Sequence, residues 1–160
     1  MNKARQPAPT DQAVGDMLCF SIYSAGHAFN QLYRPLLDEI GLTYPQYLVM
    51  VALWNRDGLR VKELGDTLFL DSSTLTPLLK RMEAAGLITR TRNPEDERQV
   101  LLHVTDQGWA LRTRAQPVAA CIQEAVGQDA ETLSKVQVAI DAIRDNLQKR
   151  DEPTGAHDNR

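Results

Sequence analysis

Cys19 is the residue of this sequence with the clearest capacity for chemistry, because phenols follow it at helical spacing. Tyr23 comes four residues later, so in a helix its phenol would lie one turn, about 6 Å along the axis, from the thiol. A phenol that donates a hydrogen bond to sulfur favours the thiolate, which is the form that peroxides oxidise. The pair therefore indicates a redox-sensing thiol as one interpretation.

Tyr33 and Tyr44 are two further phenols that bear on this interpretation. Tyr33 is fourteen residues from Cys19, roughly 21 Å along a continuous helix, and cannot reach the thiol of its own chain. It could reach the thiol of a second copy if two such helices crossed antiparallel in a dimer, and folding could bring Tyr44 there as well. The alternative is that Cys19 is a small buried hydrophobe, as free cysteines usually are. Spacing alone leaves both interpretations open.

The element that must position the thiol is a long helix predicted over 12–40. Two stripes with steps of three and four run along it, which is typical of helices that pack side by side. The apolar stripe is Leu18, Ile22, Ala25, Phe29, Leu32 and Leu36, and beside it lies a second stripe of Cys19, Tyr23, Gly26, Asn30 and Tyr33. Pro35 is expected to kink or break this helix near Tyr33, and Gly41 to end it. A second helix follows over 45–56, with Thr43 as its N-cap, and it is apolar on all sides, as a central helix is.

Residues 59–85 predict two helices, over 59–70 and 73–85, that a tight turn joins. The second buries one apolar face and presents small polar and basic side chains on the other, which suits approach to base edges in a major groove. A merely solvated face would show more Glu and Lys pairs, and Pro77 sacrifices a backbone hydrogen bond. The candidate DNA-contacting residues are Ser72, Ser73, Thr74, Thr76, Pro77, Lys80 and Arg81.

A hairpin is predicted next, with strands over 87–93 and 99–105 and a turn-rich loop between them. Arg90, Arg92 and Arg98 crowd it, and arginines on such a ribbon suit phosphate contacts and insertion into a narrow minor groove. Asp96 lies two residues before Arg98, and we expect it to orient that arginine rather than to contact DNA. Together with the preceding helix pair, the hairpin indicates a winged helix.

Two C-terminal helices are predicted, one over 106–126 that Pro117 interrupts and one that ends near residue 149. The apolar seam of the last helix fits either a dimer interface with the N-terminal helix or packing on its own chain. The predicted fold is thus all-α with a small β-hairpin wing, in a single domain over 1–160. We expect 12–40 and 106–149 to be dimerisation helices, 45–105 to be the winged helix-turn-helix part, and 1–11 and 150–160 to be flexible arms.

Composition narrows the possible functions. The sequence has 42% hydrophobic and 24% charged residues, which is ordinary for a globular protein, and its net charge of −3 still allows a clustered basic surface. It lacks an apolar signal core and a membrane-spanning run, so we expect a cytoplasmic protein without membrane partners. The two cysteines match no zinc or haem motif, and no catalytic motif is present. We therefore expect no metal, no cofactor and no enzymatic activity.

The order of elements resembles the multiple antibiotic resistance regulator (MarR) family, and the segment from Glu95 to Gly108 resembles that family's wing. The resemblance implies a homodimeric winged-helix transcription factor that binds a pseudo-palindromic operator. Within the family, the chain is most similar to the organic hydroperoxide resistance regulators (OhrR). The matching features are Cys19 with tyrosines at offsets of 4, 14 and 25, and the recognition segment that contains Pro77.

In that subgroup the cysteine senses peroxide and the tyrosines hydrogen-bond it, those at offsets 14 and 25 coming from the partner subunit. Cys121 matches the second cysteine of the two-cysteine type, which implies an intersubunit disulfide. The resemblance thus implies a repressor that binds its operator when reduced and releases it when an organic hydroperoxide oxidises Cys19. One alternative is a regulator of the same fold that responds to a small aromatic ligand. A more distant one is a thiol peroxidase that uses Cys19 and Cys121.

Overall fold

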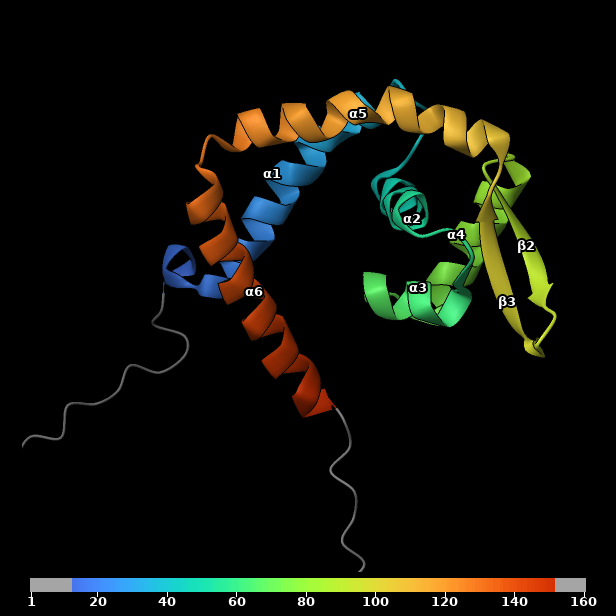
Figure 1. Cartoon of the computed structure of the whole chain (residues 1–160). Coiled ribbons are helices and arrows are strands. Elements are labelled where there is room, and N and C mark those ends of the chain that lie inside the picture. Colours follow the sequence, from blue (N-terminus) through green and yellow to red (C-terminus); the bar gives the residue numbers. More distant parts are fainter. Residues whose placement is uncertain (1–12, 152–160) are drawn as a thin grey trace, which may run out of the picture. The chain divides into compact units, whose positions relative to one another are not determined.

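A computed structural model describes residues 13–151 (Figure 1). The predicted arms lie outside the described residues, except at 150 and 151, where the last helix ends. The chain divides into two compact units, 1–122 and 123–160, and each is described by itself. Within 13–151, none of the helices combines the length and the apolar composition that a bilayer span requires.

The first long helix, α1 (Leu18–Asp38), follows a short 3-10 helix, η2 (Val14–Asp16). It begins later than the sequence predicts. The sequence predicts a kink or a break at Pro35, and the helix does not break there, because α1 continues for three residues beyond it. One of these, Leu37, is only 1% exposed, so packing offsets the lost backbone bond. Gly41 then has a φ of +74°, and the Leu42 N–H bonds the Leu37 carbonyl, which closes the helix end.

The central helix, α2 (Tyr44–Asn55), begins as the sequence predicts. The Thr43 hydroxyl accepts a hydrogen bond from the Gln46 N–H, and the Gln46 side chain accepts one from the Thr43 N–H at 2.9 Å. Five of its twelve residues are buried, which confirms a central position. Its Trp54 side chain donates a hydrogen bond of 3.0 Å to the Gly108 carbonyl, which ties α2 to a later helix.

The helix-turn-helix consists of α3 (Val61–Leu68) and α4 (Ser72–Ala84). The predicted start of its first helix at Leu59 is wrong, because Leu59–Arg60 form a short strand, β1. Helix α4 begins one residue earlier than predicted, with Asp71 as its N-cap. Its buried face is the predicted one: Leu75, Leu78, Leu79 and Met82.

The hairpin consists of β2 (Ile88–Asn93) and β3 (Asp96–Val104) and lies beside α4, at the right of Figure 1. Strand β1 pairs with the other side of β3, so the described residues contain an antiparallel sheet of three strands, in the order β1-β3-β2, where the sequence predicts two. The sequence predicts that Val100, Leu102 and Val104 alternate inward. Leu102 and Val104 are buried, whereas Val100 is half-buried. Six α-helices and this sheet, within 13–151, form a winged helix fold.

Helix α5 (Asp106–Val126) runs through Pro117 without the predicted interruption. Pro117 itself is exposed, whereas Ala115 and Val118 on either side of it are buried, so water can satisfy the freed carbonyl while packing keeps the helix continuous. The second unit contains α6 (Ala130–Asp151). Asp129 caps this helix by accepting a hydrogen bond from the Thr132 N–H at 2.9 Å.

Candidate functional site

Cys19 lies in the first turn of α1 with its side chain exposed, so it is not a core residue of its own chain. Tyr23, one turn later, is 70% exposed. The Tyr23 ring stacks on His27, with centroids 6.5 Å apart, and lies 6.4 Å from the ring of Phe20. The thiol is therefore accessible in a single chain, and the aromatic residues Phe20 and Tyr23 follow it on the helix.

The same stretch of α1 carries an exposed apolar surface. Leu18, Ile22 and Phe29 are 59%, 38% and 41% exposed. These residues lie on the stripe that the sequence predicts to pack along another helix. Contiguous exposed apolar side chains on a helix are typical of a surface that a partner covers.

Tyr33 and Tyr44 meet at the opposite end of α1. Their ring centroids are 4.6 Å apart, and the ring of Tyr47 is 5.9 Å from that of Tyr33. Burial, together with the neighbouring phenols, raises the pKa of Tyr33 to about 12, and burial also raises the pKa of Tyr44 and of Tyr47. All three phenols stay protonated at neutral pH and can donate hydrogen bonds.

Tyr47 is a third member of this cluster, and it lies on the central helix that the sequence predicts to be apolar on all sides. The signal in the sequence is its position three residues after Tyr44, which places both on one face of a helix. Tyr47 is 8% exposed and so forms the inner side of the cluster, whereas Tyr33 and Tyr44 are half-buried.

The structure does not bring Tyr33 to Cys19 of the same chain. Since α1 is continuous from Leu18 to Asp38, the fourteen-residue separation corresponds to about 21 Å along the axis. Tyr44 packs on Tyr33 and belongs to the same end of the helix. Cys121 lies on α5, exposed and unbonded like Cys19.

The outward side of α4 is open, as the sequence predicts. The seven candidate DNA contacts on it are all exposed: Ser72, Ser73, Thr74, Thr76, Pro77, Lys80 and Arg81. Ser73 has an additional structural role, because its hydroxyl donates a 2.6 Å hydrogen bond to the Asp71 carboxylate that caps the helix. These bonds hold the pKa of Asp71 below its usual range.

The arginines of the hairpin differ in how they are held. Arg90 donates a 2.8 Å hydrogen bond to Glu83 of α4, which lowers the pKa of that carboxyl and commits much of the guanidinium to a contact within the fold. Arg92 is exposed, and the side chain of Arg98 is 92% exposed. The Asp96 carboxylate accepts hydrogen bonds from the N–H and the Nε of Arg98, so the predicted orienting contact is present.

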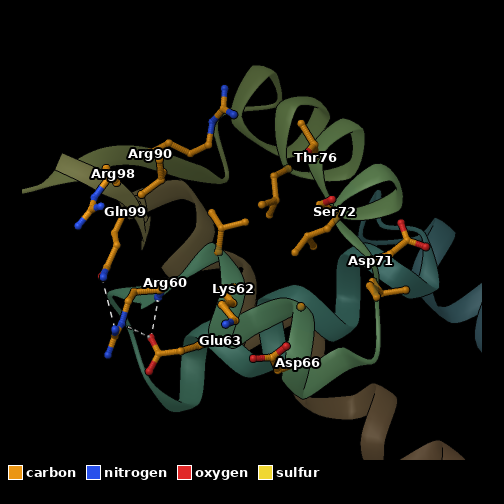
Figure 2. Close-up of a pocket in the computed structure, with 16 residues that line it drawn as sticks. Arg60, Lys62, Glu63, Asp66, Asp71, Ser72, Thr76, Arg90, Arg98 and Gln99 are labelled. Carbon is orange, nitrogen blue, oxygen red and sulfur yellow. Dashed lines mark hydrogen bonds and ion pairs between the residues drawn. The ribbon is translucent and has the colours of Figure 1, made fainter. Parts of the chain in front are cut away.

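A cavity of about 840 Å³ lies between α3, α4 and the hairpin (Figure 2). Apolar side chains such as Leu75, Leu79 and Val100 line it, together with the basic side chains of Arg60, Arg90 and Arg98. Lys62 and the acidic Glu63, Asp66 and Asp71 line it as well, so the concave surface that the wing and the recognition helix share carries charges of both signs.

Comparison with known proteins identifies the family. A family model described as "Transcriptional regulator SarA/Rot" matches residues 31–112. The organic hydroperoxide resistance transcriptional regulator of Bacillus subtilis (strain 168) is 42% identical to this chain over 135 residues, which cover 84% of this chain and 92% of that relative. The chain belongs to the MarR-like SarA/Rot family of transcriptional regulators.

A second MarR-like relative is the HTH-type transcriptional regulator TtmR of Methylorubrum extorquens (strain PA1), which is 46% identical over 143 residues, or 87% of this chain and 71% of the relative. The solved structures include AbfR of Staphylococcus epidermidis in several states. Reduced AbfR bound to DNA is 32% identical, with 85% of this chain and 92% of that chain covered and a TM-score of 0.68.

Overoxidised AbfR bound to DNA matches at 31% identity, with 84% and 94% covered and a TM-score of 0.71. Disulfide-formed AbfR matches at 32% identity, with 81% and 91% covered and a TM-score of 0.59. These MarR-like proteins are regulators and not enzymes, so the thiol-peroxidase interpretation is set aside, and the predicted resemblance to the MarR family is confirmed.

Proposed function

We propose that this chain is a homodimeric repressor that binds a pseudo-palindromic operator when it is reduced. An organic hydroperoxide oxidises Cys19, a disulfide forms with Cys121 of the other subunit, and the operator is released. The recognition helix α4 enters the major groove, and the arginines of the wing contact phosphates and the adjacent minor groove. The similarity to the Bacillus subtilis regulator supports organic hydroperoxide as the inducer.

The arrangement of α1 carries this proposal. An exposed thiol lies at one end of the helix, half-buried phenols lie at the other end, and exposed apolar side chains lie between them. Two copies of α1 that cross antiparallel would cover the apolar side chains and place Tyr33 and Tyr44 of each subunit beside the thiol of its partner. Because the phenols remain protonated, they can donate hydrogen bonds that favour the Cys19 thiolate.

The redox step is a two-electron oxidation of sulfur. The Cys19 thiolate attacks one peroxide oxygen, the O–O bond breaks, and the leaving alkoxide takes a proton from water, so the products are a sulfenic acid and the alcohol of the hydroperoxide. The thiol of the partner's Cys121 then attacks the sulfenic sulfur, which forms the disulfide and releases water. A disulfide needs Cα atoms within about 7 Å of each other, so thiols that start farther apart would draw their helices together.

The disulfide, rather than oxidation as such, is the step to which we assign operator release. AbfR is described on DNA both in its reduced and in its overoxidised state, and separately in a disulfide form. A covalent bond between subunits changes the separation of the two recognition helices, which must match one turn of DNA, about 34–36 Å. A sulfinic or sulfonic group on one subunit imposes no such constraint.

The deciding experiment is a binding assay on an operator selected by the reduced protein from a pool of random duplexes. Fluorescence anisotropy would be measured with wild type and Cys19→Ser, each with and without one equivalent of cumene hydroperoxide. We expect the wild type to release the duplex and Cys19→Ser to retain it. Release of DNA from Cys19→Ser on oxidation would remove Cys19 as the sensor. Release by salicylate without any change in thiol content would favour the aromatic-ligand alternative.

A further inference from the structure

Arg98 lies in a part of the wing where strand pairing is interrupted. The hairpin register passes from Arg92 opposite Val100 directly to Asn93 opposite Asp96, so residues 97–99 have no ladder partner in β2. On its other side, β3 pairs with β1 only at Leu101 and Leu102. The backbone ladder therefore does not fix the conformation of the segment that carries Arg98.

The contact between Asp96 and Arg98 is not enough to hold the guanidinium in one place. The Arg98 side chain is 92% exposed, and an exposed ion pair contributes little free energy by itself. The orientation of Arg98 is therefore defined only if the Asp96 carboxylate is itself held. Its Oδ1 accepts from Arg98, which leaves Oδ2 for another donor.

Gln99 supplies that donor and is itself held from two sides. Its Nε2 donates a 3.0 Å hydrogen bond to Asp96 Oδ2. Its Oε1 accepts two longer hydrogen bonds, from Asn93 Nδ2 at 3.3 Å and from Arg60 Nη1 at 3.4 Å. The reverse amide orientation would place oxygen against a carboxylate and nitrogen against two donors, so these partners fix the assignment.

Arg60 joins this cluster to the helix-turn-helix, as Figure 2 shows. Its N–H and Nε both donate to Glu63 Oε2 in the first turn of α3, at 2.9 and 3.2 Å. Arg56, just after α2, donates a 2.7 Å hydrogen bond to Glu63 Oε1. A series of hydrogen-bonded side chains thus connects the end of α2 to Arg98, through Glu63, Arg60, Gln99 and Asp96.

We infer that Gln99 is a positioning residue for operator binding, because its amide links the Asp96–Arg98 pair of the wing to Arg60 of the helix-turn-helix. An amide can donate to the carboxylate and accept from the two donors at once, whereas a carboxylate or an apolar side chain of the same length cannot. The inference rests on the proposed contact between the wing arginines and DNA, but not on peroxide sensing. It is therefore tested with reduced protein alone.

The test is a double-mutant cycle of Gln99→Met with Arg98→Ala on the selected duplex. Methionine keeps the length and the neutral charge of glutamine but provides none of its three hydrogen bonds. We expect Gln99→Met to weaken binding about 3- to 10-fold, the range of one or two net hydrogen bonds. In the Arg98→Ala background, the same substitution should change binding less than about 2-fold. Thr91→Met, at an exposed position of the same hairpin, is the matched control and should bind as wild type.

Footprinting supplies a readout that a general loss of stability would not produce. Gln99→Met should lose protection only at the outer, wing-contacted ends of the duplex and keep it over the major-groove half-sites. An equal loss of affinity in both backgrounds would overturn the inference, as would a uniform loss of protection. If Arg98→Ala alone binds as wild type, Arg98 does not contact the operator, and both the inference and that part of the proposed function are wrong. This outcome is independent of peroxide sensing by Cys19. Gln99→Leu, which also lacks these hydrogen bonds and adds no charge, guards against misfolding of the methionine variant and should behave alike.

Discussion

Tyr33 on α1 and Tyr44 at the start of α2 have ring centroids 4.6 Å apart, although a helix end and a turn separate them in the sequence. The contact joins the two helices and leaves both rings half-exposed on one side. In the proposed dimer this pair forms the wall against which the partner's Cys19 rests.

Removing either hydroxyl of this pair should slow oxidation of the thiol. Tyr33→Phe and Tyr44→Phe each take away a donor to the sulfur, so the thiolate fraction falls at neutral pH. We expect the rate constant with cumene hydroperoxide to fall about 10-fold, the effect of losing one hydrogen bond of about 1.5 kcal/mol to a charged group. Stopped-flow loss of free thiol measures it. Tyr47→Phe is the matched control, and an equal slowing there would mean that the whole cluster, rather than two hydroxyls, acts on the sulfur.

Alkaline titration should reveal the raised pKa of Tyr33. Its folded-state pKa is about 12, against an ordinary value of 10.0, so between these values the folded chain keeps a proton that the unfolded chain has lost. The free energy of unfolding should therefore fall as the pH rises from about 10 to about 12. Urea unfolding of wild type and Tyr33→Phe checks this, because the decline should be shallower in the variant. Absorbance at 295 nm should show one late tyrosinate fewer in the variant than in the wild type, because the pKa of Tyr44 and of Tyr47 is raised as well.

A charge on the exposed stripe of α1 should dissociate the dimer. Phe29 is 41% exposed in a single chain, and burying a glutamate there without a partner is costly. In sedimentation, Phe29→Glu should shift the mass from twice the 17.9 kDa chain to that of one chain, and operator binding should fall with it. Phe69→Glu introduces the same charge at an exposed aromatic between α3 and α4 and should stay dimeric. A dimeric Phe29→Glu would exclude this stripe from the interface.

Gly108→Ala should destabilise the fold severely. A Cβ at this position would collide with the Leu87 carbonyl oxygen and lie 2.7 Å from Val104 Cγ1, and the nearest atom is backbone that cannot rotate away. We expect a loss of about 1–3 kcal/mol or more in the free energy of unfolding, measured by urea titration. Gly15→Ala, where nothing lies within 4 Å, is the control. A small loss at both glycines would mean that the hairpin base shifts easily.

The sequence predicts those features of the fold that local chemistry determines. The capping box of Thr43, the buried face of α4 and the alternation on β3 depend on neighbouring residues, and the structure has them. Strand β1 was missed because its two residues become a strand only by pairing with β3, some forty residues later. Both helices continue past their prolines, Pro35 and Pro117, because the buried Leu37 and Val118 pack beyond them.

In the candidate site, too, the sequence predicts the local contacts but not those that depend on tertiary packing. Spacing along one helix was enough to place Cys19 and Tyr33 at opposite ends of α1, and the loop sequence was enough to pair Asp96 with Arg98. It was not enough to show that Tyr47 joins Tyr33, or that Gln99 meets Arg60. Each of these contacts crosses between elements whose approach depends on tertiary packing.

Because Gly108 has no side chain, the first turn of α5 packs directly against the base of the wing, at Leu87 and Val104. Transfer of a wing from one regulator of this kind to another would therefore have to include its contact with α5 as well as the hairpin itself. A chimera that exchanges residues 88–104 without a glycine at position 108 would hold the hairpin at a different angle to α5. Such a chimera would bind the intended DNA poorly.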